Sequence, residues 1–408
     1  MNLRSPLIQQ VSLDHWYRIE VFLVNEIGLF KRADIEPNGR VYLGCDLLIP
    51  SSTATSLTPF QRDESYQIYV RPCTLASSTL PITDIAGFLG NGKGSFEYKI
   101  TINKEKHQNQ PPQLGPRYLR IYCRQCDQFP KQLKTPPPEN LDDLILPLVV
   151  GPIELTDIDP DLVLPTNTPI ENLPSSIPTV HDTYRLFSFQ SSSNNEVGGK
   201  DNINIAIHES WESGIPGKIW DSALVMYKML KLMVQKNKTI LDGKHIMDLS
   251  AGTGLIGLSV VEDANPSKVT ITELDEALNL INDNVNLNKY LTTKCSLNVK
   301  ALLWGDKQQA QGCGKADIIL ASDVLYESEF FEDLVKTFVD VCNTNGRIYI
   351  GYKRRGLDHN EEERFWKLCE QHFNITLLND PSINDSDKDV VPPLAFESGV
   401  QIYKLIFK

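Results

Sequence analysis

A glycine-rich turn between two short apolar runs carries the clearest chemical signal in the sequence. Asp248 closes the first run, Gly252 and Gly254 follow it, and Glu273 closes the next apolar run. In parallel sheets such a turn lets a nucleotide-like ligand lie against bare backbone at a helix start. An acid at the end of the next strand can accept hydrogen bonds from the two ribose hydroxyls. The pattern therefore predicts a cofactor that contains a nucleoside.

Two cofactor classes fit the turn, and the charge of Asp248 separates them. The segment from Gly252 to Gly257 reads G-x-G-x-x-G, which also fits a nicotinamide dinucleotide. A carboxylate at Asp248 would repel a pyrophosphate, because like charges disfavour each other at short range. S-adenosylmethionine has no phosphate and carries a sulfonium and an ammonium group, so an acid suits it. We therefore expect S-adenosylmethionine, with a nicotinamide-dependent reductase as the alternative.

Five motifs follow one another between residues 217 and 326. They are Gly217 to Ala223 around Trp220, Asp248 to Gly254, the acid Glu273, the pair Trp304-Gly305, and Asp323 to Tyr326. In this order and spacing they resemble the seven-strand protein-lysine methyltransferases of the methyltransferase-16 family. The resemblance covers roughly residues 181–380, and a last strand is expected to reach residue 407.

This resemblance implies roles for the residues of the motifs. Asp323 and Tyr326 would face the target lysine, at the carboxyl end of a strand where ligands of open α/β sheets sit. One departure is Ser250, which stands where the family usually has glycine and takes a positive φ less readily. Whether Ser250 weakens cofactor binding is left open by the sequence. The cofactor-binding residues would be Trp220, Asp248, Ser250, Gly252, Gly254, Glu273, Leu274, Trp304 and Ser322.

Most of these residues also have a purely structural interpretation. Trp220 and Trp304 are large enough to be ordinary core residues. Glu273 suits the start of a helix, where the helix dipole favours an acid. Asp323 suits the N-cap of a helix that begins near Ser328. The sequence does not separate these interpretations from the functional ones, and for Asp323 both can hold.

The elements around the motifs alternate between strand and helix patterns from residue 216 onward. Such alternation predicts a mostly parallel sheet with helices on both faces. The strand count matches the Rossmann-like sheet of the family, in which one strand is antiparallel. The expected strands are 245–249, 268–272, 296–303, 317–322, 346–352, 373–378 and 400–407.

The chain is expected to divide into two domains, since a single core rarely grows beyond about 250–300 residues. Residues 1–158 form the first, a mostly-β sandwich or barrel of unknown role, because several segments alternate apolar and polar residues. Residues 159–180 are a proline-rich linker, and residues 181–408 are the methyltransferase domain, which opens with a hairpin at 184–189 and 203–207. The strands expected in the first domain are 15–25, 40–48, 65–71, 95–103, 117–124 and 144–153.

Composition narrows the environment and the partners. The 408 residues include 41% hydrophobic and 23% charged residues, as is typical of a globular protein. The net charge of −12 argues against duplex nucleic acid and suits a basic partner such as a lysine-bearing surface. No run approaches about 20 apolar residues, so no membrane association is expected. The start lacks a signal-peptide pattern and the eight cysteines are scattered, so we expect the cytoplasm, with the nucleus as an alternative.

Two further clusters have weak chemical signals. Cys123 and Cys126 form one C-x-x-C without a second pair, and Cys45 and Cys73 would join them only if the fold brought all four together. We therefore expect no metal.

The basic run from Lys353 to Arg355 follows a strand near the active edge, where it either meets an acidic substrate patch or forms a solvated loop.

Methyl transfer from a sulfonium is an in-line displacement, so the enzyme supplies alignment and exclusion of water. A lysine acceptor, with an ordinary pKa of about 10.4, must lose its proton first. Tyr326 can line the channel and attract the amine. Asp323 would stabilise the unreactive ammonium form, so we expect it to orient the amine while water takes the proton. Two other functions stay open: a small-molecule or terminal-amine methyltransferase, and a catalytically weak binding module on this fold.

Overall fold

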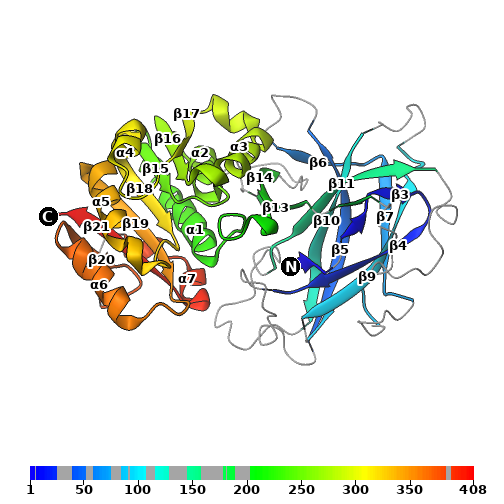
Figure 1. Ribbon diagram of the computed structural model, residues 1–408. Coiled ribbons are helices and arrows are strands. Elements are labelled where there is room, and N and C mark those ends of the chain that lie inside the picture. The colour runs from blue at the N-terminus through cyan, green and yellow to red at the C-terminus, as the bar shows by residue number, and fades with distance from the viewer. Residues whose placement is uncertain are drawn as a thin grey trace. The chain divides into compact units, whose positions relative to one another are not determined.

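The computed structural model describes residues 1–4, 6–24, 39–51, 58–74, 84–90, 92–106, 115–127, 145–157, 178–180, 182–188, 203–382 and 387–408. The chain forms two compact units, Met1–Ala206 and Ile207–Lys408 (Figure 1). The division falls within strand β14 (Ile203–Glu209). Apart from residues 178–180, the expected linker at 159–180 lies outside the described residues.

Most described strands of the first unit form one sheet, whose main path has the order β1-β4-β9-β8-β5-β10-β11-β13-β14. Strands β3, β6 and β7 pair with β11, β5 and β9 beside this path, and β2 (Leu7–Ile8) pairs separately with β12 (Thr179–Val180). The bounds of the other strands are β1 Asn2–Leu3, β3 Gln10–Ser12, β4 Trp16–Phe22, β5 Arg40–Pro50, β6 Phe60–Arg62, β7 Tyr66–Arg71, β8 Gly87–Leu89, β9 Lys93–Ile102, β10 Arg117–Asp127, β11 Leu148–Thr156 and β13 Thr183–Ser188.

Alternating side chains place one face of this sheet on a single apolar core. Ile19 and Val21 of β4 are buried there beside Phe96, Tyr98 and Ile100 of β9, because successive residues of a strand point to opposite faces. The prediction of a separate, mostly-β domain is confirmed. Strand β13, which the sequence assigned to the second domain, pairs with β11 in the sheet of the first unit.

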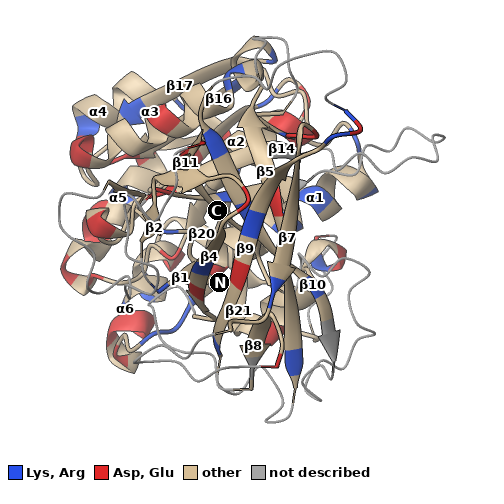
Figure 2. Ribbon diagram, turned by 90° about the vertical axis from the view of Figure 1, so that its right-hand side faces the viewer, with Lys and Arg blue, Asp and Glu red and all other residues tan. Residues whose placement is uncertain are grey.

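Opposite charges pair across neighbouring strands of the first unit, along whose ribbons acidic and basic residues are interspersed (Figure 2). Arg71 of β7 lies in register with Glu97 of β9, and the two form an ion pair of 2.8 Å. Arg120 of β10 is likewise in register with Asp46 of β5, at 3.7 Å. Cross-strand pairs of this kind favour the observed register over a slipped one.

The second unit contains a seven-stranded sheet in the order β17-β16-β15-β18-β19-β21-β20. Only β21 runs antiparallel to its neighbours β19 and β20. This is the predicted Rossmann-like sheet, and each expected strand is present. The bounds are β15 His245–Leu249, β16 Lys268–Glu273, β17 Ser296–Ala301, β18 Ala316–Ser322, β19 Cys342–Lys353, β20 Phe373–Leu377 and β21 Val400–Phe407.

Helices cover both faces of this sheet (Figure 1). Met247 and Leu249 of β15 share one core with Phe331 and Phe338 of α5. The intervening residue, Asp248, points to the opposite face, where α2 supplies its hydrogen-bond partner. The helices are α1 Asp221–Lys236, α2 Leu255–Asp263, α3 Leu278–Leu287, α4 Lys307–Cys313, α5 Phe331–Val341, α6 His359–Glu370 and α7 Pro393–Ser398. Within the described ranges, none of the helices is long and apolar enough to span a membrane.

Candidate functional site

The candidate residues gather where three neighbouring parallel strands end. Strand β15 lies between β16 and β18, with Leu249 in register with Thr272 on one side and Ala321 on the other. The chain order reverses on either side of β15, which makes this the switch point where ligands of open α/β sheets bind. The glycine turn, Glu273 and Asp323 therefore leave the sheet at one edge.

Backbone strain is concentrated at the same edge. Ser250 has φ +58° and Asp323 has φ +53°, directly after β15 and next to the end of β18. A left-handed conformation in a non-glycine residue costs of the order of 1–3 kcal/mol and persists only where the surroundings enforce it. Such positions cluster at functional sites, so their location supports a site at this edge.

Asp248 is a buried carboxylate of which only one oxygen accepts a hydrogen bond. The Gly257 amide donates to Oδ2 at 2.7 Å, whereas Oδ1 is buried and has no hydrogen-bond partner. Burial raises the pKa of Asp248 to about 7; the Gly257 amide opposes this shift and the charge of Glu273 adds to it. An unpartnered buried carboxylate oxygen is costly, and a cationic or N–H ligand would satisfy it. Asp248 therefore fits a cofactor that carries an ammonium group.

The glycines of the turn are each required by geometry. Gly252 and Gly254 have φ +56° and +81°, and Gly254 caps the start of α2. A Cβ on Gly257 would lie 2.6 Å from the Ile271 side chain, so only glycine lets α2 pack this closely on β16. The resulting turn presents backbone N–H groups at the N-terminus of α2, as a cofactor-binding turn does.

Glu273 ends β16 and is tied to the turn. Its Oε2 accepts the Gly252 amide at 2.9 Å and its Oε1 accepts the Leu274 amide at 2.9 Å. Burial raises the pKa of Glu273, and these two amides counteract the effect. Each carboxylate oxygen keeps further lone pairs that ribose hydroxyls can use. Leu274 is 37% exposed beside it.

Ser250 has a specific contact that explains a serine at this position. Its hydroxyl accepts a hydrogen bond of 2.9 Å from the indole N–H of Trp304, which follows β17. The Trp304 ring in turn lies 6.1 Å from the ring of Tyr326, at 58°. Ser250 thus fixes the Trp304 ring, and Trp304 in turn contacts Tyr326, so that residues following β15, β17 and β18 are connected.

We predict that Ser250→Ala lowers the free energy of unfolding by about 1 kcal/mol, because it removes this hydrogen bond and keeps the strained backbone. Ser250→Gly also removes the hydroxyl but relieves about 1 kcal/mol of strain, so its stability should stay near that of the wild type. Denaturant unfolding of both variants measures the difference. Equal stability of Ser250→Ala and the wild type would mean that the Trp304 hydrogen bond contributes nothing.

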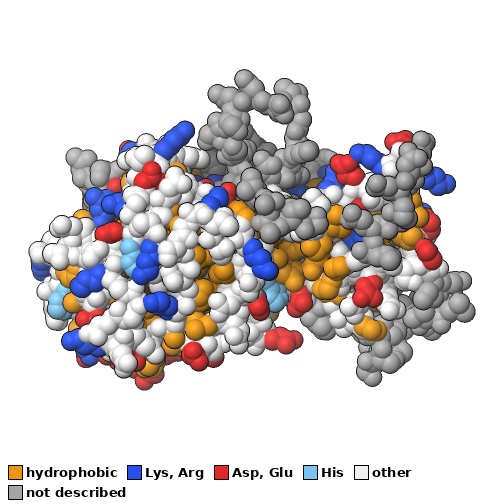
Figure 3. Space-filling view, turned by 90° about the horizontal axis from the view of Figure 1, so that it is seen from above, with side chains coloured by type: hydrophobic (Ala, Val, Ile, Leu, Met, Phe, Trp, Pro, Cys, Tyr) orange, Lys and Arg blue, Asp and Glu red, His pale blue; other side chains and the backbone are white. Residues whose placement is uncertain are grey.

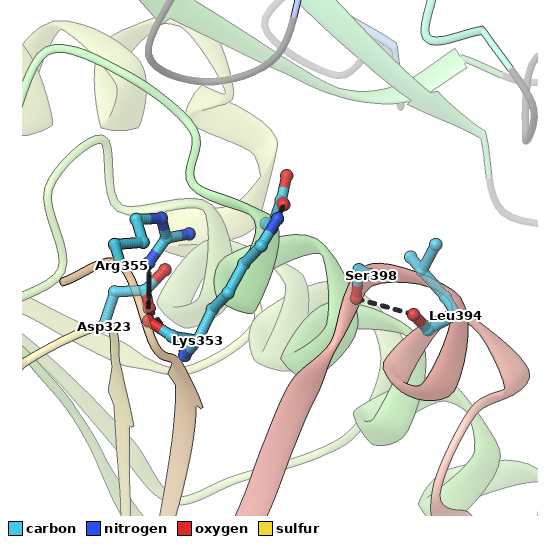
Figure 4. Close-up of polar contacts among 6 residues, drawn as sticks. Asp323, Lys353, Arg355, Leu394 and Ser398 are labelled. Atoms are coloured by element: carbon cyan, nitrogen blue, oxygen red, sulfur yellow. Dashed lines mark hydrogen bonds and ion pairs between the residues drawn. The ribbon is translucent and has the colours of Figure 1, made fainter. Parts of the chain in front are cut away.

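Asp323 lies in a network that the sequence did not predict (Figure 4). Its Oδ1 accepts hydrogen bonds from Arg355, at 2.6 Å, and from the Lys353 amide, at 3.1 Å. Its Oδ2 is buried and has no hydrogen-bond partner. The Lys353 ammonium pairs with Asp221 at the start of α1. Both Lys353 and Arg355 are thus held in ion pairs, while Arg354, Arg355 and Gly356 lie exposed, as expected of a solvated loop.

Trp220 and Ser322 occupy less central positions. Trp220 precedes α1 as its N-cap, and its indole N–H donates to the Ile215 carbonyl at 2.9 Å. The Arg355 guanidinium lies 5.1 Å above the Trp220 ring, which connects Trp220 to Asp323. Ser322 is the last residue of β18 and is half-buried beside Asp323.

The alternative role of Asp323 as a helix cap is wrong. The 3-10 turn Ser328–Phe330 has Glu327 at its N-cap position, and helix α5 begins after Phe330. The carboxylate of Asp323 instead faces the loop after β19.

Asn284 is a supporting residue that sequence reasoning missed. It is fully buried on α3, and its amide nitrogen donates to the Thr253 carbonyl of the glycine turn at 2.9 Å. The same side chain exchanges two hydrogen bonds with the backbone of His208. In the sequence, Asn284 is a polar residue on the helix face that also carries Leu280 and Ile281, and this is the one signal that could have indicated its role.

The cysteines give no metal site among the described side chains. Cys45, Cys73 and Cys123 are buried free thiols, and the side chain of Cys126 lies outside what the structure describes. No group of three or more His, Cys, Asp or Glu with metal-binding geometry occurs in the described part of the chain.

Comparisons with known proteins give a consistent result. Residues 199–372 match the lysine methyltransferase family. Protein N-lysine methyltransferase METTL21A of Mus musculus is 30% identical over 190 residues, which are 46% of this chain and 81% of that protein. EEF1A lysine methyltransferase 3 of Mus musculus is 32% identical over 172 residues, 42% of this chain and 70% of that protein. Protein-lysine methyltransferase METTL21E of Bos taurus is 34% identical over 170 residues, 41% of this chain and 56% of that protein.

Proposed function

The chain belongs to the lysine methyltransferase family, and from this premise we propose that it transfers the methyl group of S-adenosylmethionine to a lysine side chain of a protein. The observation that carries the proposal is a pair of buried carboxylate oxygens without partners, Oδ1 of Asp248 and Oδ2 of Asp323. They belong to the ends of the neighbouring strands β15 and β18. One suits the ammonium of the methyl donor and the other the amine of the acceptor.

S-adenosylmethionine, when bound, supplies a methyl group on a sulfonium. The residues of this chain hold the donor in place: Asp248 attracts its ammonium, Glu273 accepts hydrogen bonds from its ribose, and the amides after Gly252 line the turn. Trp304 and Leu274 flank the base in this proposal. Alignment of the methyl group with the acceptor is what the site contributes to an in-line displacement.

The acceptor lysine must reach the site as a neutral amine. Its ordinary pKa of about 10.4 falls when the side chain enters an apolar channel next to another positive charge. In this proposal Tyr326, whose own pKa is raised by burial and by the charges of Glu273 and Glu327, presents its ring to the amine. Oδ2 of Asp323 accepts a hydrogen bond from one N–H of the amine and so orients the lone pair of the amine nitrogen. The proton that the lysine loses passes to water.

Exposed apolar side chains near the strand ends support a protein as the acceptor. Leu303, Tyr326 and Phe330 are 54%, 47% and 44% exposed, and hydrophobic side chains lie between charged ones on one face of the second unit (Figure 3). Such side chains can pack on a substrate segment.

To test the proposal, release of S-adenosylhomocysteine is measured with the dialysed protein fraction of a cell extract and with its small-molecule filtrate. Turnover with the protein fraction alone is expected; turnover with the filtrate alone would favour the small-molecule alternative.

Cofactor affinity is predicted to depend on pH through Asp248. Its pKa of about 7 in the free protein lies above the unfolded value near 3.9, so its contribution to stability is present below pH 4 and is lost as the pH rises through 7. A bound ammonium reverses this preference, because it favours the carboxylate. The affinity for S-adenosylhomocysteine should therefore rise up to about tenfold between pH 6 and 8 and then level off.

Calorimetric titration at several pH values measures this dependence, with NADH as a control ligand that should not bind. Asp248→Asn should bind more weakly and lose the dependence between pH 6 and 8. If the affinity of Asp248→Asn for S-adenosylhomocysteine still rose between pH 6 and 8, another group would cause the dependence. Glu273 is an example, because burial also raises its pKa.

The remaining assignments are proposals of the same kind. We propose residues 1–158 as a separate β domain and residues 159–180 as a linker. The catalytic domain, expected from the sequence at 181–408, is proposed as the unit Ile207–Lys408, because β13 pairs in the sheet of the first unit. We also propose the cytoplasm as the compartment, which is supported by the free thiol state of every cysteine whose side chain is described.

A further inference from the structure

Arg355 makes the shortest polar contact of Asp323 among the described residues. Its Nη1 donates to Oδ1 at 2.6 Å, and the two side chains are only 23% and 8% exposed. The guanidinium also lies 5.1 Å above the Trp220 ring. The Lys353 amide shares the same Oδ1. Two hydrogen bonds to Oδ1 thus hold the carboxylate, the Trp220 ring packs on the guanidinium that donates one of them, and Oδ2 is the oxygen left without a hydrogen-bond partner.

We propose that Arg355 is a positioning residue that neutralises the Asp323 carboxylate and so lets the acceptor lysine lose its proton in the site. This inference rests on the proposed lysine methylation. It assigns to Arg355 a role in the reaction that the five sequence motifs do not include.

The physical reason lies in the charge of the carboxylate. A bare carboxylate beside the acceptor would hold it as an ammonium, since an opposite charge within about 4–6 Å shifts a pKa by about 1–3 units toward the charged form. A carboxylate paired with a guanidinium has little net charge, yet it still offers Oδ2 as a hydrogen-bond acceptor. Arginine suits this role because it stays charged at every working pH.

Other charged groups around this loop come from several elements, and they are unchanged in every substitution of Arg355. Lys353 and Asp221 form an ion pair with each other. Arg354 pairs with Glu362 of α6 at 2.5 Å. Burial and the charges of Glu273 and Glu327 raise the pKa of Tyr326, the other residue assigned to the acceptor. A difference between variants at Arg355 therefore reports on its own charge.

The test is the pH profile of kcat/KM for methyl transfer at saturating S-adenosylmethionine. The profile rises with pH as the acceptor loses its proton. In Arg355→Gln the midpoint of this rise in kcat/KM should shift to higher pH by at least about one unit. At neutral pH, kcat/KM should therefore fall about tenfold or more. KM for the acceptor should stay the same or decrease, because the ammonium form binds better. Arg355→Lys keeps the charge and should restore the wild-type midpoint.

Arg354→Gln is the matched control, since Arg354 contacts Glu362 and His359 rather than Asp323. Its midpoint should coincide with that of the wild type. Arg355→Met, which keeps the packing on Trp220, provides a second uncharged variant if Arg355→Gln does not fold. Folding is checked by thermal unfolding and by S-adenosylhomocysteine affinity.

The inference is overturned if the pH midpoint of kcat/KM is the same in the wild type and in both uncharged variants. This holds even if their activity falls by the same factor at every pH, because an equal loss at every pH indicates a structural contact. Failure of Arg355→Lys to restore the midpoint also overturns it. Absence of any methyl transfer by the wild type is a different result: it removes the proposed function itself, and the inference with it.

Discussion

Asp323→Asn is expected to lower kcat/KM for methyl transfer by at least about a hundredfold, the loss that follows when an acceptor is no longer aligned with its reaction partner. The substitution keeps the size of the side chain. However, it removes the ion pair with Arg355 and replaces one of two carboxylate oxygens with an N–H donor. A donor facing the amine would turn its lone pair away from the methyl group. The measurement is steady-state methyl transfer to a protein substrate.

Cofactor affinity should stay within about threefold in Asp323→Asn, because Asp323 is assigned to the acceptor and not to the donor. Glu329→Gln is a suitable control, since Glu329 is exposed in the turn that follows the same loop. Wild-type activity in Asp323→Asn would contradict the assignment of Asp323. A matching loss of cofactor affinity would instead place Asp323 in the donor site.

Glu273→Gln is expected to weaken S-adenosylhomocysteine binding by about tenfold to a hundredfold. Hydrogen bonds to a charged partner contribute about 1.5–3 kcal/mol each, and 1.4 kcal/mol corresponds to a tenfold change in affinity. The amide keeps the length of the side chain but has only one acceptor oxygen for the Gly252 amide, the Leu274 amide and the ribose hydroxyls.

Calorimetric titration measures the loss in Glu273→Gln, and Glu276→Gln is the matched control. Glu276 is exposed in the 3-10 turn that directly follows, and it carries the same charge. Its substitution should leave the affinity unchanged. Equal affinities of the Glu273 variant and the wild type would remove Glu273 from the cofactor site.

The sheet of the second unit was predictable because its central strands are buried on both faces. The run from Ile318 to Ala321 is continuously apolar, as central parallel strands are. The first unit was predictable as β-rich for a different reason, the alternation that places Phe96, Tyr98 and Ile100 on the core. Strands of two or three residues, such as β1 and β8, were missed because they are too short to show a period.

The site was predictable only where a local motif carries it. The glycine turn is local, and its positive φ values at Gly252 and Gly254 follow from the residue type. The contacts that distinguish this chain are long-range. Ser250 bonds to Trp304, 54 residues away, and Arg355 lies 32 residues after its partner Asp323. Sequence spacing does not encode such contacts, since they depend on the order in which strands enter the sheet.

The central claim is tested most directly by transfer of label from methyl-labelled S-adenosylmethionine to proteins of a cell extract. Labelled proteins are hydrolysed to amino acids, and the labelled species is identified by mass spectrometry, with the wild-type chain and Asp323→Asn compared in parallel. The account predicts methylated lysine with the wild type and almost none with Asp323→Asn. Label on another residue, or equal label with both chains, would contradict it.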